Sequence, residues 1–514
     1  MNLKYSKVNL AELGFILSES TTKTLLPFGS VWVSGQFLGY PTDFVANGDF
    51  SNHLGRIVSD INLKVNEKSF EKSTYQGHIS LIDFDLGKYF NDPVTYQKIN
   101  MEGKISGSGF VQSEANFELV SKIKSVGIKG YNYQNITTDA RFSSQFFSGS
   151  LQIDDPNMQV HAKGSIDLRN NLNLIKIQAT LDTVNLDKVN IARKKLFIQG
   201  DVNIDMKGFV LDSLSGDALV KDLKLNYNSE WLSLDEVSLH AERSNRGRQL
   251  RFESDIVDAQ VEGDFYFSSL FRDIRSLLNE FYLNIKNDKN SIRDYYAKKT
   301  RTPEDYEANF DVDLKNITPV TNLFKIDLKV GGNTNIDGKF SSGNTTLIHA
   351  FSIVDSIQYE NVLLTDTELE VNASKVSDST HALVMAFVSS ANQKIGELKT
   401  KEFITEAIWD GSHIDFNVSL DQQTRDNYLR LNGLIDFNDS TEIRILNSSK
   451  IQLLEKVWTV DSANQLSVKG KEWGIHNLRW INEAQSVSLD GHFSQDQTKK
   501  ITLAIQDFTL ASIN

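Results

Sequence analysis

The chain has 514 residues, a net charge of -13 and no cysteine. This length exceeds what one hydrophobic core needs, so several domains or a repeat array are expected. The negative charge argues against binding along a nucleic-acid backbone, because phosphate affinity comes from clustered lysine and arginine. The absence of cysteine excludes a disulfide framework, a thiolate metal site and a cysteine nucleophile. It also favours an oxidising compartment.

Neither end of the chain resembles a targeting or membrane-spanning segment. Met1 leads straight into mixed polar and apolar residues, and no later stretch reaches the roughly 18 apolar residues of a transmembrane helix. The last residues follow directly on a strand-like run. We therefore expect an internal piece of a longer chain.

Alternation of apolar and polar residues is the dominant pattern along the chain. Apolar side chains of one parity recur in 198–210, in 310–314, in 326–330 and in 414–420. Such alternation is typical of strands with one apolar and one polar face. The sequence therefore predicts an all-β fold with few helices.

Glycine occupies the apolar parity of these strands more often than chance allows. About five of the 30 glycines would be flanked by apolar residues at both ±2 positions at random, given 40% apolar composition. The pattern occurs at Gly35, Gly48, Gly77, Gly103, Gly149, Gly164, Gly200, Gly208, Gly216, Gly263, Gly338, Gly433 and Gly491. Two interpretations stay open: bulges or corners in an ordinary barrel, or a long sheet that curves toward its glycine-bearing face.

One segment departs from the strand pattern. After Ser268 and Ser269, which can cap a helix, apolar residues recur at three- and four-residue steps as far as Phe281. A charged stretch follows. We predict a first β block over 1–267, a helical insertion and charged loop over 268–307, and a second β block over 308–514. The helix either covers the open end of a sheet or has a binding role.

The motifs of enzymes, metal sites and cofactor sites are missing from the sequence. The nine histidines are scattered without metal-ligand spacing, and carboxylate pairs such as Asp311 and Asp313 lie on polar strand faces. The glycine-rich run 103–109 is not followed by a helix that could complete a phosphate-binding loop. We expect no catalytic residue, no metal and no cofactor.

The combination of these elements resembles the AsmA-like superfamily, and within it the TamB family of translocation and assembly module proteins. The order and density of degenerate strand–glycine motifs carry the resemblance, in residues 75–89, 103–109, 130–136, 147–151, 155–157, 181–186 and the helix after 261–265. The resemblance implies an elongated β-taco, a sheet folded lengthwise around an apolar groove. It also implies a periplasmic protein of the bacterial envelope, anchored in the inner membrane by parts outside this segment, that conducts phospholipid to the outer membrane.

An apolar strand face left without a covering layer can shield acyl chains instead of packing a core. The residues expected to line such a groove share the apolar parity of their strands: Val202, Ile204, Met206, Val261, Phe265, Phe267, Phe310, Val312, Leu314, Ile326, Leu328, Val330, Ile414, Phe416 and Val418. The alternative is that they fill a closed β-sandwich core.

The expected partners follow from the groove and from the resemblance. They are phospholipid acyl chains and an outer-membrane barrel protein, with no nucleic acid. Two other functions stay open: a scaffold for the insertion of outer-membrane proteins or autotransporters, which would pair client strands with exposed edges, and an extracellular β-sandwich adhesin.

Overall fold

The computed structural model describes the chain except residues 11, 13–25, 41, 67–71, 110–114, 170–172, 209, 245–246, 287–288, 300–303, 333, 378, 412, 438–439, 454, 470–471, 494–499 and 509–514. It divides into two compact units, Met1–His240 and Ala241–Asn514. The division falls within strand β14 (Glu230–Ser244). The two strands that follow it pair with each other, and the second of them also pairs with the first strand after the helical insertion.

The prediction of an all-β fold built on one long sheet is confirmed. Among the described residues, 32 strands are hydrogen-bonded into one sheet, and every pair with a defined register is antiparallel. The same residues contain only four α-helices. Strong alternation and scarce proline, six in 514 residues, explain this content, because each favours extended chain.

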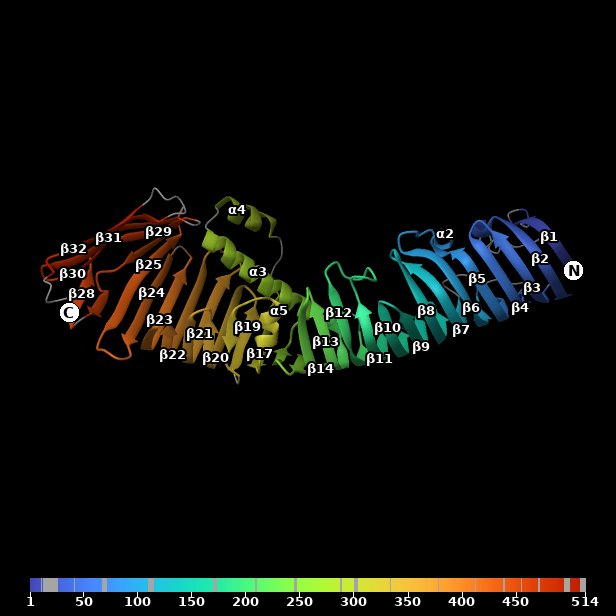
Figure 1. Cartoon of the computed structure of the whole chain (residues 1–514), viewed down its shortest axis with the longest axis horizontal. Coiled ribbons are helices and arrows are strands. Elements are labelled where there is room, and N and C mark those ends of the chain that lie inside the picture. Colours follow the sequence, from blue (N-terminus) through green and yellow to red (C-terminus); the bar gives the residue numbers. More distant parts are fainter. Residues whose placement is uncertain are drawn as a thin grey trace. The chain divides into compact units, whose positions relative to one another are not determined.

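Unit 1 is an antiparallel meander in which each strand pairs with the next along the chain (Figure 1). Its strands are β1 (Asn2–Asn9), β2 (Ser30–Tyr40), β3 (Asp43–Asn52), β4 (Gly55–Lys64), β5 (Thr74–Asp85), β6 (Tyr96–Ser108), β7 (Asn116–Ile128), β8 (Tyr131–Ser143), β9 (Phe146–Asp155), β10 (Met158–Asp167), β11 (Leu174–Asn185), β12 (Leu196–Lys207) and β13 (Ser215–Tyr227). Helix α2 (Leu86–Phe90) follows β5, and short 3-10 turns lie at Leu26–Phe28 and Leu211–Ser213.

Unit 2 is a second antiparallel array, which a helical insertion interrupts after its second strand, and several of its strands skip the next strand along the chain and pair with a later one (Figure 1). Its strands are β15 (Gly247–Ser254), β16 (Val257–Gly263), β17 (Tyr306–Leu314), β18 (Leu328–Val330), β19 (Thr334–Ser342), β20 (Thr345–Tyr359), β21 (Val362–Val376), β22 (Ala382–Ile395), β23 (Leu398–Asp410), β24 (His413–Gln422), β25 (Tyr428–Phe437), β26 (Thr441–Ile445), β27 (Lys450–Leu453), β28 (Lys456–Val460), β29 (Gln465–Lys469), β30 (Glu472–Asn482), β31 (Gln485–Phe493) and β32 (Ile501–Gln506). Its helices are α3 (Phe267–Lys286), α4 (Lys289–Lys298) and α5 (Thr318–Leu323).

The fully buried core of unit 1 lies along one end of its strands. Leu54, Phe84 and Val189 are 2%, 4% and 1% exposed and belong to one buried apolar cluster. Leu86 and Tyr89 of α2 pack against this cluster. Asp85 caps α2, because its carboxylate accepts a hydrogen bond from the Lys88 N–H at 3.0 Å. Short turns between strands thus cover the sheet at one end of its strands.

Helices α3 and α4 occupy the segment where the sequence predicts a helical insertion. The apolar spacing from Leu270 to Phe281 forms α3, whose buried side chains include Phe267, Leu270 and Leu277. In Figure 1, α3 runs along one end of the unit 2 strands. No helix among the described residues is long and apolar enough to cross a membrane.

Candidate functional site

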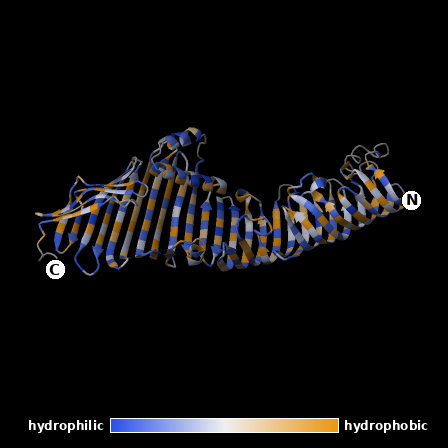
Figure 2. Cartoon of the chain, turned by 45° about the horizontal axis from the view of Figure 1, so that its top comes forward, coloured by the Kyte–Doolittle hydropathy of each residue, from blue (hydrophilic) through white to orange (hydrophobic). Residues whose placement is uncertain are grey.

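One face of unit 1 carries rows of apolar side chains that cross the strands. Directly paired residues of antiparallel strands place their side chains side by side on one face. The central row contains no charged or hydrogen-bonding side chain across twelve strands: Ala218, Ile204, Ile177, Gly164, Gly149, Ala140, Leu119, Ile105, Gly77, Ile61, Ala46 and Phe37. The banding of the strands in Figure 2 reflects this alternation.

The two neighbouring rows of unit 1 have nearly the same character. Met206 begins a row that continues through Ile175, Ile166, Phe147, Phe142, Phe117, Gly107, Tyr75, Leu63, Phe44 and Gly39. The row of Val202 includes Ala179, Ala162, Leu151, Thr138, Ser121, Gly103, Ile79, Ser59, Gly48 and Gly35. The three predicted residues of β12 therefore each belong to a different row of one apolar face.

Glycine pairs allow adjacent strands of unit 1 to approach closely on this face. Gly164 lies opposite Gly149, and Gly35 lies opposite Gly48. A Cβ added to Gly164 would overlap the Lys176 carbonyl, and one added to Gly35 would lie 2.5 Å from the Gly48 Cα. The absence of a side chain at these positions therefore permits an approach of neighbouring backbone that any larger residue would block.

Unit 2 presents an equivalent apolar face of its own. The row of Phe310 runs through Leu250, Val261, Phe310, Gly338, Ala350, Val371, Ala386, Ala407, Phe416, Gly433 and Ile445. Val312 and Val418 belong to a second row, and Ile414 belongs to a third row that also contains Ala308, Phe340 and Trp409. Leu314 pairs with Val257 and Thr334 at the margin of this face.

Much of each apolar face stays in contact with solvent. Val202, Ile204, Phe310, Val312, Phe416 and Val418 are all only half-buried. The described elements therefore do not seal these faces as the core of a sandwich is sealed.

Two hollows on the apolar side of unit 1 have the size of small-molecule sites. One, of about 650 Å³, lies over β1 to β4 and is lined by Val31, Val33, Phe37, Phe44 and Phe50, among others. The other, of about 630 Å³, lies over β3 to β8 and is lined by Ile61, Leu63, Tyr75, Ile105 and Phe117, among others. The sequence prediction did not name these residues, although they show the same alternation as β12.

Some predicted lining residues lie elsewhere. Phe265 and Phe267 are 3% and 2% exposed and pack edge-to-face at 5.1 Å. Phe267 begins α3, and Phe265 also contacts the Tyr306 ring at 6.3 Å, so both side chains are buried in an aromatic cluster and do not line an open face. Ile326 is 49% exposed and precedes β18, because α5 and its following turn interrupt the alternation. Leu328 and Val330 form β18 but pair with Tyr359 and Ile357, beyond the rows described above.

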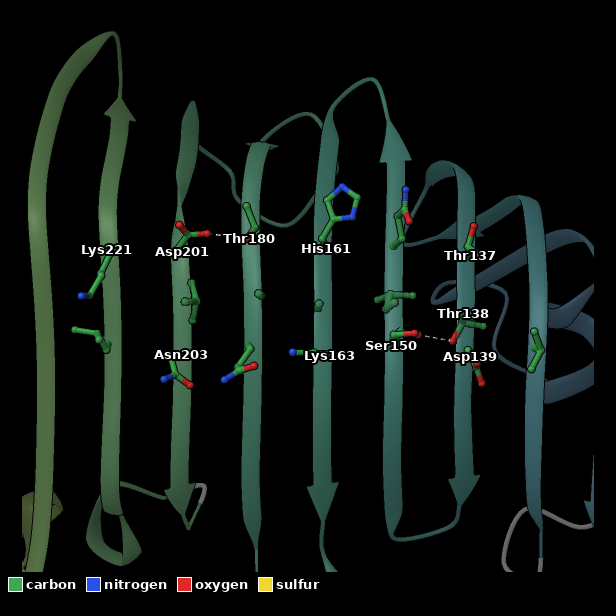
Figure 3. Close-up of a pocket in the computed structure, with 18 residues that line it drawn as sticks. Thr137, Thr138, Asp139, Ser150, His161, Lys163, Thr180, Asp201, Asn203 and Lys221 are labelled. Carbon is green, nitrogen blue, oxygen red and sulfur yellow. Dashed lines mark hydrogen bonds between the residues drawn. The ribbon is translucent and has the colours of Figure 1, made fainter.

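The opposite face of unit 1 is polar. A hollow of about 960 Å³ lies on this face. Figure 3 shows residues that line it, and Thr137, His161, Thr180, Asp201 and Lys221 among them form one row across neighbouring strands. These side chains are exposed, and the Thr180 hydroxyl donates to Asp201 at 2.7 Å. Within the described ranges, no group of three or more metal-ligating side chains comes together.

Helix α3 is fixed to unit 2 by a buried ionic cluster. The Glu280 carboxylate is 3% exposed and accepts hydrogen bonds from Tyr295 at 3.0 Å, Tyr296 at 3.1 Å and Lys299 at 2.8 Å. Lys375 of β21, itself 2% exposed, lies 2.8 Å from the same carboxylate. The buried carboxylate therefore has four hydrogen-bonding or ionic partners, and a buried ion pair is stable only when its charges are paired in this way.

The ionisation of this cluster follows from its contacts. Burial raises the pKa of Glu280, but the hydrogen bonds and charges of Lys299 and Lys375 outweigh it and leave that pKa below its ordinary value. Burial and the adjacent Glu280 charge raise the pKa of Tyr295 to about 12 and that of Tyr296 further. The cluster is thus a charged carboxylate held by two ammonium groups and two neutral phenols.

Comparisons with protein-family models, with curated proteins and with solved structures find no match to this chain.

Proposed function

We propose that the chain binds phospholipid acyl chains on the apolar faces of its sheet and conducts them as a segment of a TamB-type protein of the AsmA-like superfamily. The observation that carries the proposal is the central row of unit 1, which crosses twelve strands without a charged or hydrogen-bonding side chain. An equivalent row crosses unit 2 through Phe310 and Phe416. In the proposed setting, the lipid passes through the periplasm between the inner and outer membranes.

The energetics favour a lipid as the occupant. Each CH₂ group removed from water contributes about 0.8 kcal/mol. Ile204 and Phe310 are only half-buried, so an acyl chain would also cover apolar side-chain surface. The central row of unit 1 and the row of Phe310 offer this cover without hydrogen-bonding side chains that the acyl chain would have to desolvate. Catalysis has no part in this function.

The two faces of one strand supply a matched test. Ile204→Glu places a charge in the central row, whereas Asn203→Glu places the same charge on the polar face of β12. We expect phospholipid that co-purifies with the protein, quantified by mass spectrometry, to fall several-fold in the first variant and to stay unchanged in the second. Circular dichroism would verify that both variants fold.

The outcomes separate the possible functions. Recovery of no phospholipid with the unmodified chain, or equal loss in both variants, would contradict the proposal. Recovery of unfolded polypeptide in place of lipid would favour a scaffold for outer-membrane protein assembly.

A further inference from the structure

Helix α3 lies on the margin of the apolar face of unit 2. Phe281 packs against Trp409 with ring centroids 5.7 Å apart, and Trp409 belongs to the row of Ala308 and Ile414. Glu280, one residue earlier, contacts Lys375, which lies next to the strand end. The Glu280 side of α3 therefore faces the strand ends, and the neighbouring Phe281 side faces the apolar rows of the sheet.

The exposed side of α3 continues in the same direction with an apolar stripe. Phe271, Leu278, Tyr282 and Ile285 are 56%, 61%, 54% and 47% exposed. At 100° per residue they occupy one side of the helix, next to Phe281. The stripe extends about 21 Å along the axis at 1.5 Å per residue. One acyl chain spans half of the hydrocarbon core of a bilayer, which is roughly 30 Å thick. The stripe is longer than this half, so it is long enough to cover one chain.

The charges of α3 are arranged asymmetrically around this stripe. Its two acidic side chains turn inward, since Glu280 is buried in the ionic cluster and Asp273 accepts a hydrogen bond from the Tyr306 hydroxyl at 3.0 Å. Arg275 and Lys286 are exposed and border the stripe. The Lys286 ammonium lies 4.6 Å from the Tyr282 ring centroid. The rim of the stripe is therefore cationic in a chain with a net charge of -13.

We propose that α3 is a second wall of the lipid groove in unit 2 and that it selects anionic phospholipids. An acyl chain lies along the stripe, and the lipid's anionic head group contacts Arg275 beside the stripe or Lys286 at its C-terminal end. The inference rests on the proposed function, because it assigns a lipid class to the same groove. Continuity of the stripe with the Trp409 row and the cationic rim favour this occupant over an uncharged one.

Competition between two lipids tests the head-group assignment. The unmodified chain is offered equal amounts of phosphatidylglycerol and phosphatidylcholine, and bound lipid is counted by native mass spectrometry. We expect a several-fold preference for phosphatidylglycerol, which the double variant Arg275→Glu, Lys286→Glu reduces to about one with total lipid unchanged. The control is Lys394→Glu, Lys399→Glu, in exposed lysines at the end of β22 and β23 opposite α3.

A second pair of variants tests the stripe. Leu278→Glu, at a side chain already 61% exposed, is expected to lower bound lipid, whereas Asn309→Glu, at an exposed position on the polar face of β17, is expected to have no effect. Lipid binding without head-group preference, or a preference that survives the double variant, would overturn the role of α3 and leave the groove intact. Binding to anionic vesicles without extraction of a lipid would make α3 a membrane contact and also overturn it. Absence of any lipid binding would overturn the proposed function itself.

Discussion

The two units limit their apolar faces by different physical means. In unit 1, strand ends and short turns pack an apolar cluster around Leu54, Phe84 and Val189. In unit 2, a 20-residue helix lies on the margin of the face and is held by a buried carboxylate with two lysines and two tyrosines. Apolar packing tolerates local rearrangement, whereas a buried ion cluster depends on every partner. We infer that unit 2 has a wall that a single substitution can release.

Loss of Glu280 should produce the largest effect. Glu280→Ala leaves Lys375 charged and buried without its carboxylate, at an expected cost of about 3–5 kcal/mol. Hydrogen exchange of the α3 amides should accelerate accordingly, with unit 1 unchanged. The double variant Glu280→Ala, Lys375→Met removes both charges and should recover part of the protection. Equal exchange in both variants would contradict a role for the ion pair.

In unit 1, the matching change removes a core side chain instead of a charge. Leu54→Ala, at a position 2% exposed, should cost about 2–5 kcal/mol through lost transfer energy and the cavity that remains. The urea midpoint reported by a spectroscopic probe in unit 1 should fall, and hydrogen exchange of the α3 amides should not change. Leu38→Ala, at a side chain 60% exposed, is the control. A comparable loss in both variants would show that the cluster is not the core of this unit.

A smaller effect is expected at the buried carboxylate of unit 1. Asp155 is fully buried and accepts hydrogen bonds from the Tyr131 hydroxyl and from the N–H groups of Gln134 and Asn157. Asp155→Asn should cost about 1.5–3 kcal/mol, the range for hydrogen bonds to charged groups. Asp154→Asn, one residue earlier and exposed, should be nearly neutral in the same unfolding assay. The account of this turn fails if the two variants are equally stable.

Acidification should have the smallest effect of the four changes, and it should act on α3 of unit 2. The pKa of Glu280 is lower in the folded chain than its ordinary value of 4.5. Its charge therefore stabilises docking of α3 fully above about pH 4.5, and this contribution is lost as the pH falls through the folded pKa. Exchange of α3 amides, corrected for intrinsic pH dependence, should rise in that window. A Glu280→Gln chain with the same pH profile would exclude this carboxylate as the cause.

Alternation predicted the strands and the apolar parity of β12, β17 and β24, because the two-residue period is a local property of the chain. It placed Ile204, Phe310 and Phe416 on apolar rows without any knowledge of pairing. Periodicity alone does not show where a strand runs directly into a helix, so Phe265 was expected in the lining but is buried against Phe267, the first residue of α3. Pairings distant in sequence leave no local pattern either; Lys375 lies in β21, far along the chain from Glu280.

The central claim is that lipid occupies the apolar rows and not the polar face. The most direct measurement is photo-crosslinking from a photoreactive residue placed at Ile204 or Val312, compared with Asn203 or Asn309 on the opposite face of the same strands. The account predicts phospholipid adducts at Ile204 and Val312 and none at Asn203 and Asn309. Adducts of equal yield on both faces, or none at either apolar position, would contradict it.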